Sequence, residues 1–159
     1  VESEEGRGSR FHFTAGFSSA VGVGASGLAV QEPADLHGLR VLIIDDNATH
    51  REILHEMFLA WRMRPVTVGS AEEALSELAL AADAGQPFQA ALADSGVDPA
   101  DGPTLVERLR KHPGLSGPVI LMLASAGGPL GSERWRTAGA QAAILKPLKQ
   151  SELLDTLLS

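Results

Sequence analysis

The strongest constraint on the fold is an alternation that begins at Gly38 and continues to the end of the chain. Short apolar runs alternate with amphipathic stretches whose apolar residues have helical spacing. This alternation is typical of repeated β-α units with a parallel sheet. The expected strands are residues 40–44, 65–68, 88–93, 118–123 and 142–145. The sequence therefore predicts an α/β fold, a doubly wound five-stranded parallel sheet with helices on both faces.

The helical stretches carry start signals. The first helix is expected from about Asn47, and Ser70 with Glu73 forms a capping box before the second. Pro103 is tolerated in the first turn of the third helix. A short fourth helix is expected over residues 132–138, and Ser151 is expected to cap the last one.

The chain before Gly38 has a different character. Residues 1–17 indicate a hairpin, with a turn at Gly6-Arg7-Gly8 and Phe11 and Phe13 on one face. Residues 18–37 are rich in Gly, Ala, Ser and Val without a helical or strand period, which is typical of a flexible linker. We therefore expect three parts: 1–17, 18–37 and a main domain over 38–159.

Composition excludes several classes of partner. The 20 acidic and 13 basic residues give a formal charge of −7, and no basic cluster is present to neutralise nucleic-acid phosphates or an anionic membrane surface. The absence of cysteine excludes disulfides and thiolate metal sites. No apolar run approaches the roughly 20 residues that cross a bilayer. Because the chain starts at Val1, we expect that its native start lies upstream.

Charged residues or small residues follow four of the predicted strands directly. Asp45 and Asp46 follow the first, Asp94 the third, Ala124 and Ser125 the fourth, and Lys146 the fifth. The carboxyl ends of parallel strands share one sheet edge, where ligands bind in doubly wound folds. Crowded carboxylates repel one another and favour a hard divalent cation such as Mg²⁺. Asp94 could then attack a phosphoryl group, with Lys146 balancing its charge.

Each residue also has a simpler interpretation. Asp46 or Asn47 could cap the first helix, and a single Asp such as Asp94 at a strand end is often a turn former. The five histidines show no metal-ligand spacing, so surface or helix positions are expected for them. The joint pattern outweighs these alternatives, because coincidence would have to place every charged member at the same end of three apolar strands.

Residues 39–158 resemble a response-regulator receiver domain. The resemblance rests on the acidic pair, the single Asp94, the Asp101-Gly102 pair and Lys146-Pro147. It implies the flavodoxin-like (βα)5 fold with strand order 2-1-3-4-5. It also implies that Asp94 is the phosphate acceptor, that Lys146 contacts the phosphoryl group, and that Mg²⁺ is bound directly by Asp46, through water by Asp45, and by the carbonyl of Gly96.

The opening residues 1–14 resemble the closing strands of a histidine kinase ATPase domain. With the receiver, this order implies a hybrid sensor histidine kinase in a two-component phosphorelay. The phosphoryl group would come from the phosphohistidine of a kinase dimerisation domain and pass to a downstream histidine phosphotransfer protein. The resemblance implies a cytoplasmic location, with a parent that can be membrane-anchored. ATP-binding residues would lie upstream of Val1, so this chain should not use ATP by itself.

Two of the switch positions depart from the receiver pattern. Ala124 stands where receivers usually carry a hydroxyl, Ser125 is its neighbour, and Ala143 replaces the aromatic switch residue. Phosphate capture should survive, while switching through the usual hydroxyl-aromatic pair should not. One alternative is a receiver that is weakly phosphorylated and regulates its kinase by docking. Another is an aspartate-nucleophile phosphatase, which would usually carry an Asp at the position of Gly96.

Overall fold

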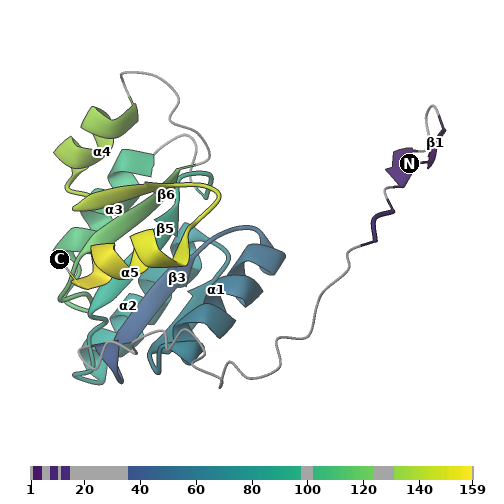
Figure 1. Ribbon diagram of the computed structural model, residues 1–159. Helices are drawn as coiled ribbons and strands as arrows, with labels where there is room; N and C mark the ends of the chain where they lie inside the picture. Colours follow the sequence, from purple (N-terminus) through teal and green to yellow (C-terminus); the bar gives the residue numbers. More distant parts are fainter. Residues whose placement is uncertain are drawn as a thin grey trace. The chain divides into compact units, whose positions relative to one another are not determined.

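The main unit is built on a five-stranded parallel sheet. The computed structural model describes residues 2–4, 8–10, 12–14, 36–97, 102–123 and 131–158. The strands lie in the order β4 (Arg64–Val68), β3 (Arg40–Ile44), β5 (Ala90–Asp94), β6 (Val119–Leu123) and β7 (Ala142–Leu145) (Figure 1). All four neighbouring pairs are parallel. Counted along this unit the order is 2-1-3-4-5, so the predicted fold class is confirmed.

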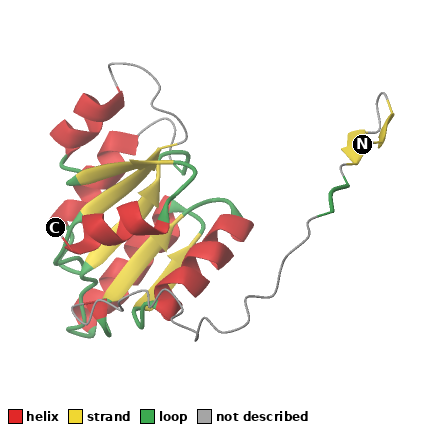
Figure 2. Cartoon of the chain, in the orientation of Figure 1, coloured by secondary structure: helices red, strands yellow, loops and turns green. Residues whose placement is uncertain are grey.

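Helices cover both faces of the sheet (Figure 2). Helices α1 (Ala48–Ala60) and α5 (Gln150–Leu158) pack on one face. Helices α2 (Ala71–Asp83), α3 (Gly102–Lys111) and α4 (Gly131–Ala138) pack on the other. A sheet covered on both faces favours apolar strands, and residues 41–44 and 90–93 are apolar without interruption.

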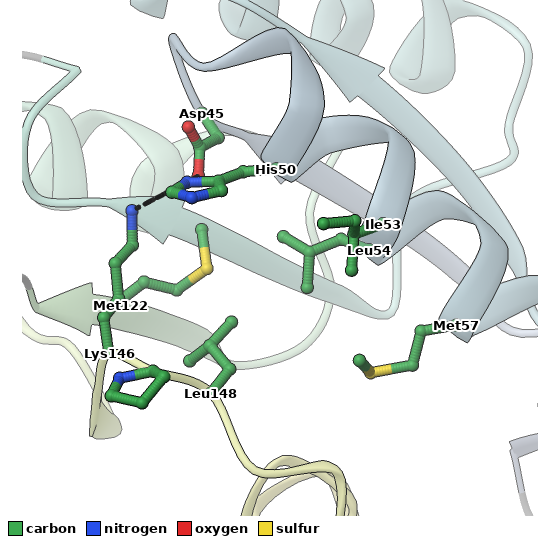
Figure 3. A pocket seen from close by; sticks show the side chains of 9 residues that line it. Asp45, His50, Ile53, Leu54, Met57, Met122, Lys146 and Leu148 are labelled. Carbon is green, nitrogen blue, oxygen red and sulfur yellow. Dashed lines mark hydrogen bonds and ion pairs between the residues drawn. The ribbon is translucent and has the colours of Figure 1, made fainter. Parts of the chain in front are cut away.

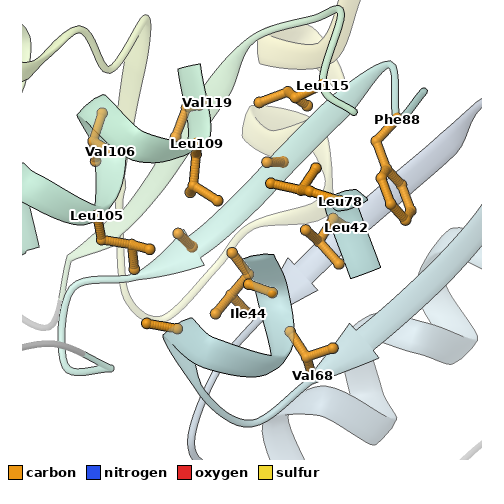
Figure 4. Packing of buried hydrophobic residues seen from close by; sticks show 14 of the residues in the cluster. Leu42, Ile44, Val68, Leu78, Phe88, Leu105, Val106, Leu109, Leu115 and Val119 are labelled. Atoms are coloured by element: carbon orange, nitrogen blue, oxygen red, sulfur yellow. The ribbon is translucent and has the colours of Figure 1, made fainter. Parts of the chain in front are cut away.

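On the central strands β3 and β5, alternate residues enter two separate hydrophobic clusters. On β3, Leu42 and Ile44 join the cluster beneath α2 and α3, which Figure 4 shows. Val41 and Ile43 point to the opposite face and join the cluster with Phe58 of α1. The central strands are thereby buried on both sides, and this rigid frame carries the residues at the strand ends.

The helix starts agree with the sequence signals except at the last helix. The side chain of Ser70 accepts a hydrogen bond from the amide of Glu73, as the capping box predicts. Ser151 does not cap α5, because the helix begins at Gln150 and Ser151 lies inside its first turn. The third strand is also shifted: it runs over Ala90–Asp94, and Phe88 forms only an isolated bridge with Leu115.

The chain divides into two units, Val1–Gln31 and Glu32–Ser159. In the first, β1 (Glu2–Glu4) and β2 (Gly8–Arg10) pair antiparallel. In the second, Leu36 is buried in the cluster that contains Phe58, so the folded unit begins before Gly38 and overlaps the predicted linker. Within the described residues, no helix combines the length and apolar character needed to cross a membrane.

Candidate functional site

Asp45 lies directly after β3 and is fully buried. Its carboxylate Oδ1 accepts a hydrogen bond from the amide of Asn47 at 2.8 Å, and its carbonyl accepts one from the guanidinium of Arg51 at 2.7 Å. Asn47 caps α1 by accepting from the amides of Thr49 and His50. The strand-to-helix turn therefore fixes Asp45 at the sheet edge. Because Asn47 is the cap, Asp46 does not serve that purpose.

Asp94 is the last residue of β5 and is 8% exposed. The register of β3 with β5 pairs Ile44 with Ala93, so Asp45 and Asp94 are adjacent at the carboxyl edge of the sheet. Within the described part of the chain, Oδ1 of Asp94 is buried and has no hydrogen-bond partner. A buried oxygen without a partner loses its hydration without compensation, so this atom is suited to binding a ligand.

Lys146 follows β7 and reaches across the end of β6 to the two aspartates. Its Nζ lies 2.9 Å from Oδ2 of Asp94 and 3.4 Å from Oδ2 of Asp45. Burial lowers the pKa of Lys146, but the hydrogen bond to Asp94 and the charges of Asp45 and Asp94 outweigh burial and raise the pKa above its ordinary value. The lysine is therefore held as an ammonium ion at the site.

Asp46 completes a cluster of three carboxylates. Ligand atoms of Asp45, Asp46 and Asp94 all lie within 4.8 Å of one another, and Asp46 is exposed while the other two are buried. One ammonium ion does not balance three carboxylates. The excess negative charge, the all-oxygen donor set and the unpartnered oxygen of Asp94 together fit a hard divalent cation.

The remaining predicted site residues have different environments. Gly96 is exposed, and a Cβ at this position would lie 3.3 Å from Oδ2 of Asp94. Its lack of a side chain therefore leaves room beside the carboxylate. Ala143 is exposed on β7 and presents only a methyl group. Ala124 and Ser125 lie outside the described residues.

His50 occupies an exposed helix position, as the sequence predicts, but it also belongs to the site. Its Nδ1 lies 3.5 Å from Oδ2 of Asp45 and 3.5 Å from Nζ of Lys146. Figure 3 shows its ring beside the lysine amine at one end of a pocket of about 490 Å³. The rest of this pocket is mainly apolar, with α1 on one side and the residues after β7 on the other; it includes Ile53, Leu54, Met57, Met122, Pro147 and Leu148. Sequence spacing does not reveal this position of His50. Its contacts with Asp45 and Lys146 depend on how the first turn of α1 packs beside the strand ends.

Comparison with protein-family models identifies the family of this chain. The model for the response regulator receiver domain matches residues 41–158. This chain belongs to that family. The receiver domain is 37% identical over 87 residues to the sensor protein TorS of Escherichia coli, an alignment that covers 54% of this chain and 9% of TorS. It is 30% identical over 116 residues to the transcriptional regulatory protein AruR of Pseudomonas aeruginosa, which covers 73% of this chain and 46% of AruR. The chain thus spans less than half the length of either relative.

Solved structures agree with the receiver fold. The chemotaxis response regulator CheY4 of Vibrio cholerae is similar with a TM-score of 0.64 and 20% identity, over 76% of this chain and 97% of that one. The receiver domain of the sensor histidine kinase PA1611 from Pseudomonas aeruginosa is similar with a TM-score of 0.58 and 23% identity, over 76% of this chain and 94% of that one. That structure has a magnesium ion coordinated in its active site cleft.

Proposed function

We propose that this receiver domain accepts a phosphoryl group from a phosphohistidine on the carboxylate of Asp94. The observation that carries the proposal is the contact of 2.9 Å between Asp94 and Lys146 inside a cluster of three carboxylates. Phosphoryl transfer depends mainly on position and on neutralisation of charge, and this arrangement provides both. Membership of the receiver family supports the same function.

Mg²⁺ is the cofactor that the cluster fits. Asp46 and Asp94 would bind the ion directly, Asp45 would bind it through water, and the carbonyl of Gly96 would supply a further oxygen. The magnesium ion of the PA1611 receiver supports this assignment. When bound, Mg²⁺ neutralises negative charge on the phosphoryl oxygens and on the surrounding carboxylates.

The protein residues then act as follows. A carboxylate oxygen of Asp94 forms a bond to phosphorus while the bond from phosphorus to the donor imidazole nitrogen breaks. The electron pair of that bond stays on the nitrogen, and a proton on the other ring nitrogen makes the departing imidazole neutral. The ammonium of Lys146 transfers its hydrogen bond from Asp94 to a phosphoryl oxygen. Gly96 has no side chain to obstruct the incoming group.

Phosphorylation by a small donor tests the proposal. The purified chain is incubated with acetyl phosphate and Mg²⁺, and its intact mass is measured over time. We expect one added phosphoryl group, with no addition in Asp94→Asn and strongly reduced addition in Asp46→Asn. The matched control is Asp83→Asn, because Asp83 is an exposed carboxylate at the end of α2.

Unchanged phosphorylation of Asp94→Asn would contradict the assignment of the acceptor. Equal loss in the Asp83→Asn control would show that the effect is not specific to the site. A loss confined to the two site variants, with normal phosphorylation of the control, is the result that the proposal requires.

The parent protein is proposed to be a hybrid sensor histidine kinase. In this arrangement residues 1–17 are the last strands of the ATPase domain, 18–37 are a linker, and 38–159 are the receiver, which would lie in the cytoplasm. The similarity to TorS and the antiparallel pair β1–β2 support this order. The phosphoryl donor would be the kinase dimerisation domain, and a histidine phosphotransfer protein would receive the group. The similarity to AruR favours a separate regulator instead, and the residues before Val1 distinguish the two.

One observation favours a second function. Ala143 is exposed and carries no aromatic ring that could change position on phosphorylation. The alternative is a weakly phosphorylated receiver that regulates its kinase by docking. Comparison of kinase output for the wild-type parent and Asp94→Asn separates the two functions, because docking alone predicts equal output.

A further inference from the structure

His50 is attached to the site by the geometry of α1. The side chain of Asn47 accepts a hydrogen bond from the amide of His50 at 3.2 Å, so the first turn of the helix fixes the position of the histidine. From this turn the imidazole extends over the contact between Asp45 and Lys146. The histidine side chain is 45% exposed, while that of Asp45 is completely buried. His50 thus forms part of the solvent-side wall of the site (Figure 3).

Among the residues that the structure describes, three groups lie close to the ammonium ion of Lys146. Two are the carboxylates of Asp94 at 2.9 Å and Asp45 at 3.4 Å, and the third is Nδ1 of His50 at 3.5 Å. An ammonium ion has three protons and donates only. The three neighbours match these three donors in number, and the histidine supplies the neighbour on the solvent side.

The chemistry proposed for the site changes two of these neighbours. Asp94 becomes an acyl phosphate, and the charge of Asp45 is shared with a divalent cation. Both changes weaken the hold of the carboxylates on Lys146, whereas His50 is neither the phosphoryl acceptor nor a proposed ligand of the cation. A long lysine side chain whose carboxylate contacts weaken has alternative rotamers before it reaches a phosphoryl oxygen, and restricting them costs conformational entropy.

We propose that His50 is a positioning residue that holds the ammonium of Lys146 in the site through Nδ1. In the tautomer that carries its proton on Nε2, Nδ1 accepts a hydrogen bond from Nζ of Lys146. The opposite tautomer would instead donate from Nδ1 to Oδ2 of Asp45, which lies 3.5 Å away. The inference rests on the proposed function only for its kinetic consequence, because the contact itself is a property of the free protein.

Three variants test the proposal. His50→Ala removes the acceptor, while His50→Asn keeps a short polar side chain that can restore it. His55→Asn is the control, since it makes the same substitution on the same helix outside the site. Its thermal stability is checked against the wild type, because Nδ1 of His55 is buried. Two quantities are measured for each: the ammonium ¹⁵N–¹H signal of Lys146 without metal, and the phosphorylation rate constant with acetyl phosphate at saturating Mg²⁺.

We expect His50→Ala to broaden or remove the Lys146 signal and to lower the rate constant by about three- to tenfold, the range for loss of one hydrogen bond of ordinary net strength, because the contact is long and half-exposed. The affinity for Mg²⁺ should change by less than about twofold, because His50 is not among the cation ligands. His50→Asn should recover both quantities, and His55→Asn should leave both unchanged.

The outcomes distinguish this inference from the proposed function. If the wild type is not phosphorylated but its Lys146 signal depends on His50, the proposed function fails and the positioning role stands. If His50→Ala keeps the wild-type signal and rate, the positioning role is overturned while the function stands. A rate loss in His50→Asn equal to that in His50→Ala would also overturn it, as would a loss explained by weaker Mg²⁺ binding.

Discussion

Lys146 is the residue that joins the strand ends electrostatically. Its ammonium contacts carboxylates that lie 52 and 101 positions earlier in the chain, those of Asp94 and Asp45. Their charges and hydrogen bonds raise the pKa of Lys146 in spite of its partial burial. The contacts that form the proposed phosphoryl-accepting site therefore also stabilise the folded protein.

The raised pKa predicts how stability depends on pH. A lysine whose pKa is higher in the folded state contributes stability that is complete below its unfolded pKa, about 10.4, and is lost as the pH rises through the folded value. The difference in free energy of unfolding between wild type and Lys146→Met should therefore be constant near neutral pH and shrink in strongly alkaline solution. Urea denaturation at a series of pH values measures it. A difference that persists unchanged at high pH would show that the ammonium charge of Lys146 contributes nothing to the free energy of unfolding.

The proposed role of Asp46 as a metal ligand predicts that the free energy of unfolding depends on Mg²⁺. If the folded cluster binds Mg²⁺ as proposed, an Mg²⁺ concentration of ten times the dissociation constant should raise the free energy of unfolding of the wild type by about 1.4 kcal/mol. Asp46→Asn removes one proposed ligand and should lose most of this gain. Urea denaturation with and without Mg²⁺ measures both effects. The buffers contain no Ca²⁺ and have the same ionic strength, so that screening of the carboxylate charges is equal in both. Equal stabilisation of the two proteins would contradict direct binding by Asp46.

Sequence reasoning located the acidic residues and the lysine, since each follows an apolar strand and parallel strands end at one edge. It did not identify His50, whose proximity to Lys146 depends on how α1 packs against the sheet. Helix packing is a tertiary property, and the pattern of apolar residues determines which face is buried but not where a polar residue of the first turn will lie.

At the level of elements, the turn from β3 into α1 is the part that holds the site together. Asn47 contributes to it twice: its side chain caps the helix and its backbone amide binds Asp45. The sequence allowed either Asp46 or Asn47 as the cap. Only the structure separates them, because both residue types are good caps and differ by one position. Ser151 illustrates the same difficulty, since helix ends are the least determined feature of a sequence pattern.

Removal of this cap should destabilise the protein. Asn47→Ala leaves the amides of Thr49 and His50 without their acceptor and should lower the free energy of unfolding by about 1 kcal/mol. The control is Thr49→Ala, which changes an exposed side chain in the same turn and retains the cap. Chemical denaturation measures both variants. A cost for Thr49→Ala as large as that for Asn47→Ala would contradict the role of the cap.

At the level of the whole molecule, the two hydrophobic clusters make the sheet rigid enough to place side chains from separate strands within contact distance. Leu42 is fully buried and Leu80 is 62% exposed, so the same truncation should have very different effects at the two positions. Leu42→Ala should cost about 2–5 kcal/mol, and Leu80→Ala about 0.5 kcal/mol or less. Thermal and urea denaturation measure the difference. Similar costs would contradict the burial that the structure shows.

The most direct test of the central claim is the binding of beryllofluoride, which mimics a phosphoryl group on a carboxylate. Amide NMR spectra are recorded for the whole chain with Mg²⁺, before and after its addition. We expect large shifts around Asp45, Asp94 and Lys146 in the wild type, and none in Asp94→Asn. An unperturbed wild-type spectrum, or the same response in Asp94→Asn, would contradict the claim that Asp94 receives the phosphoryl group in this cluster.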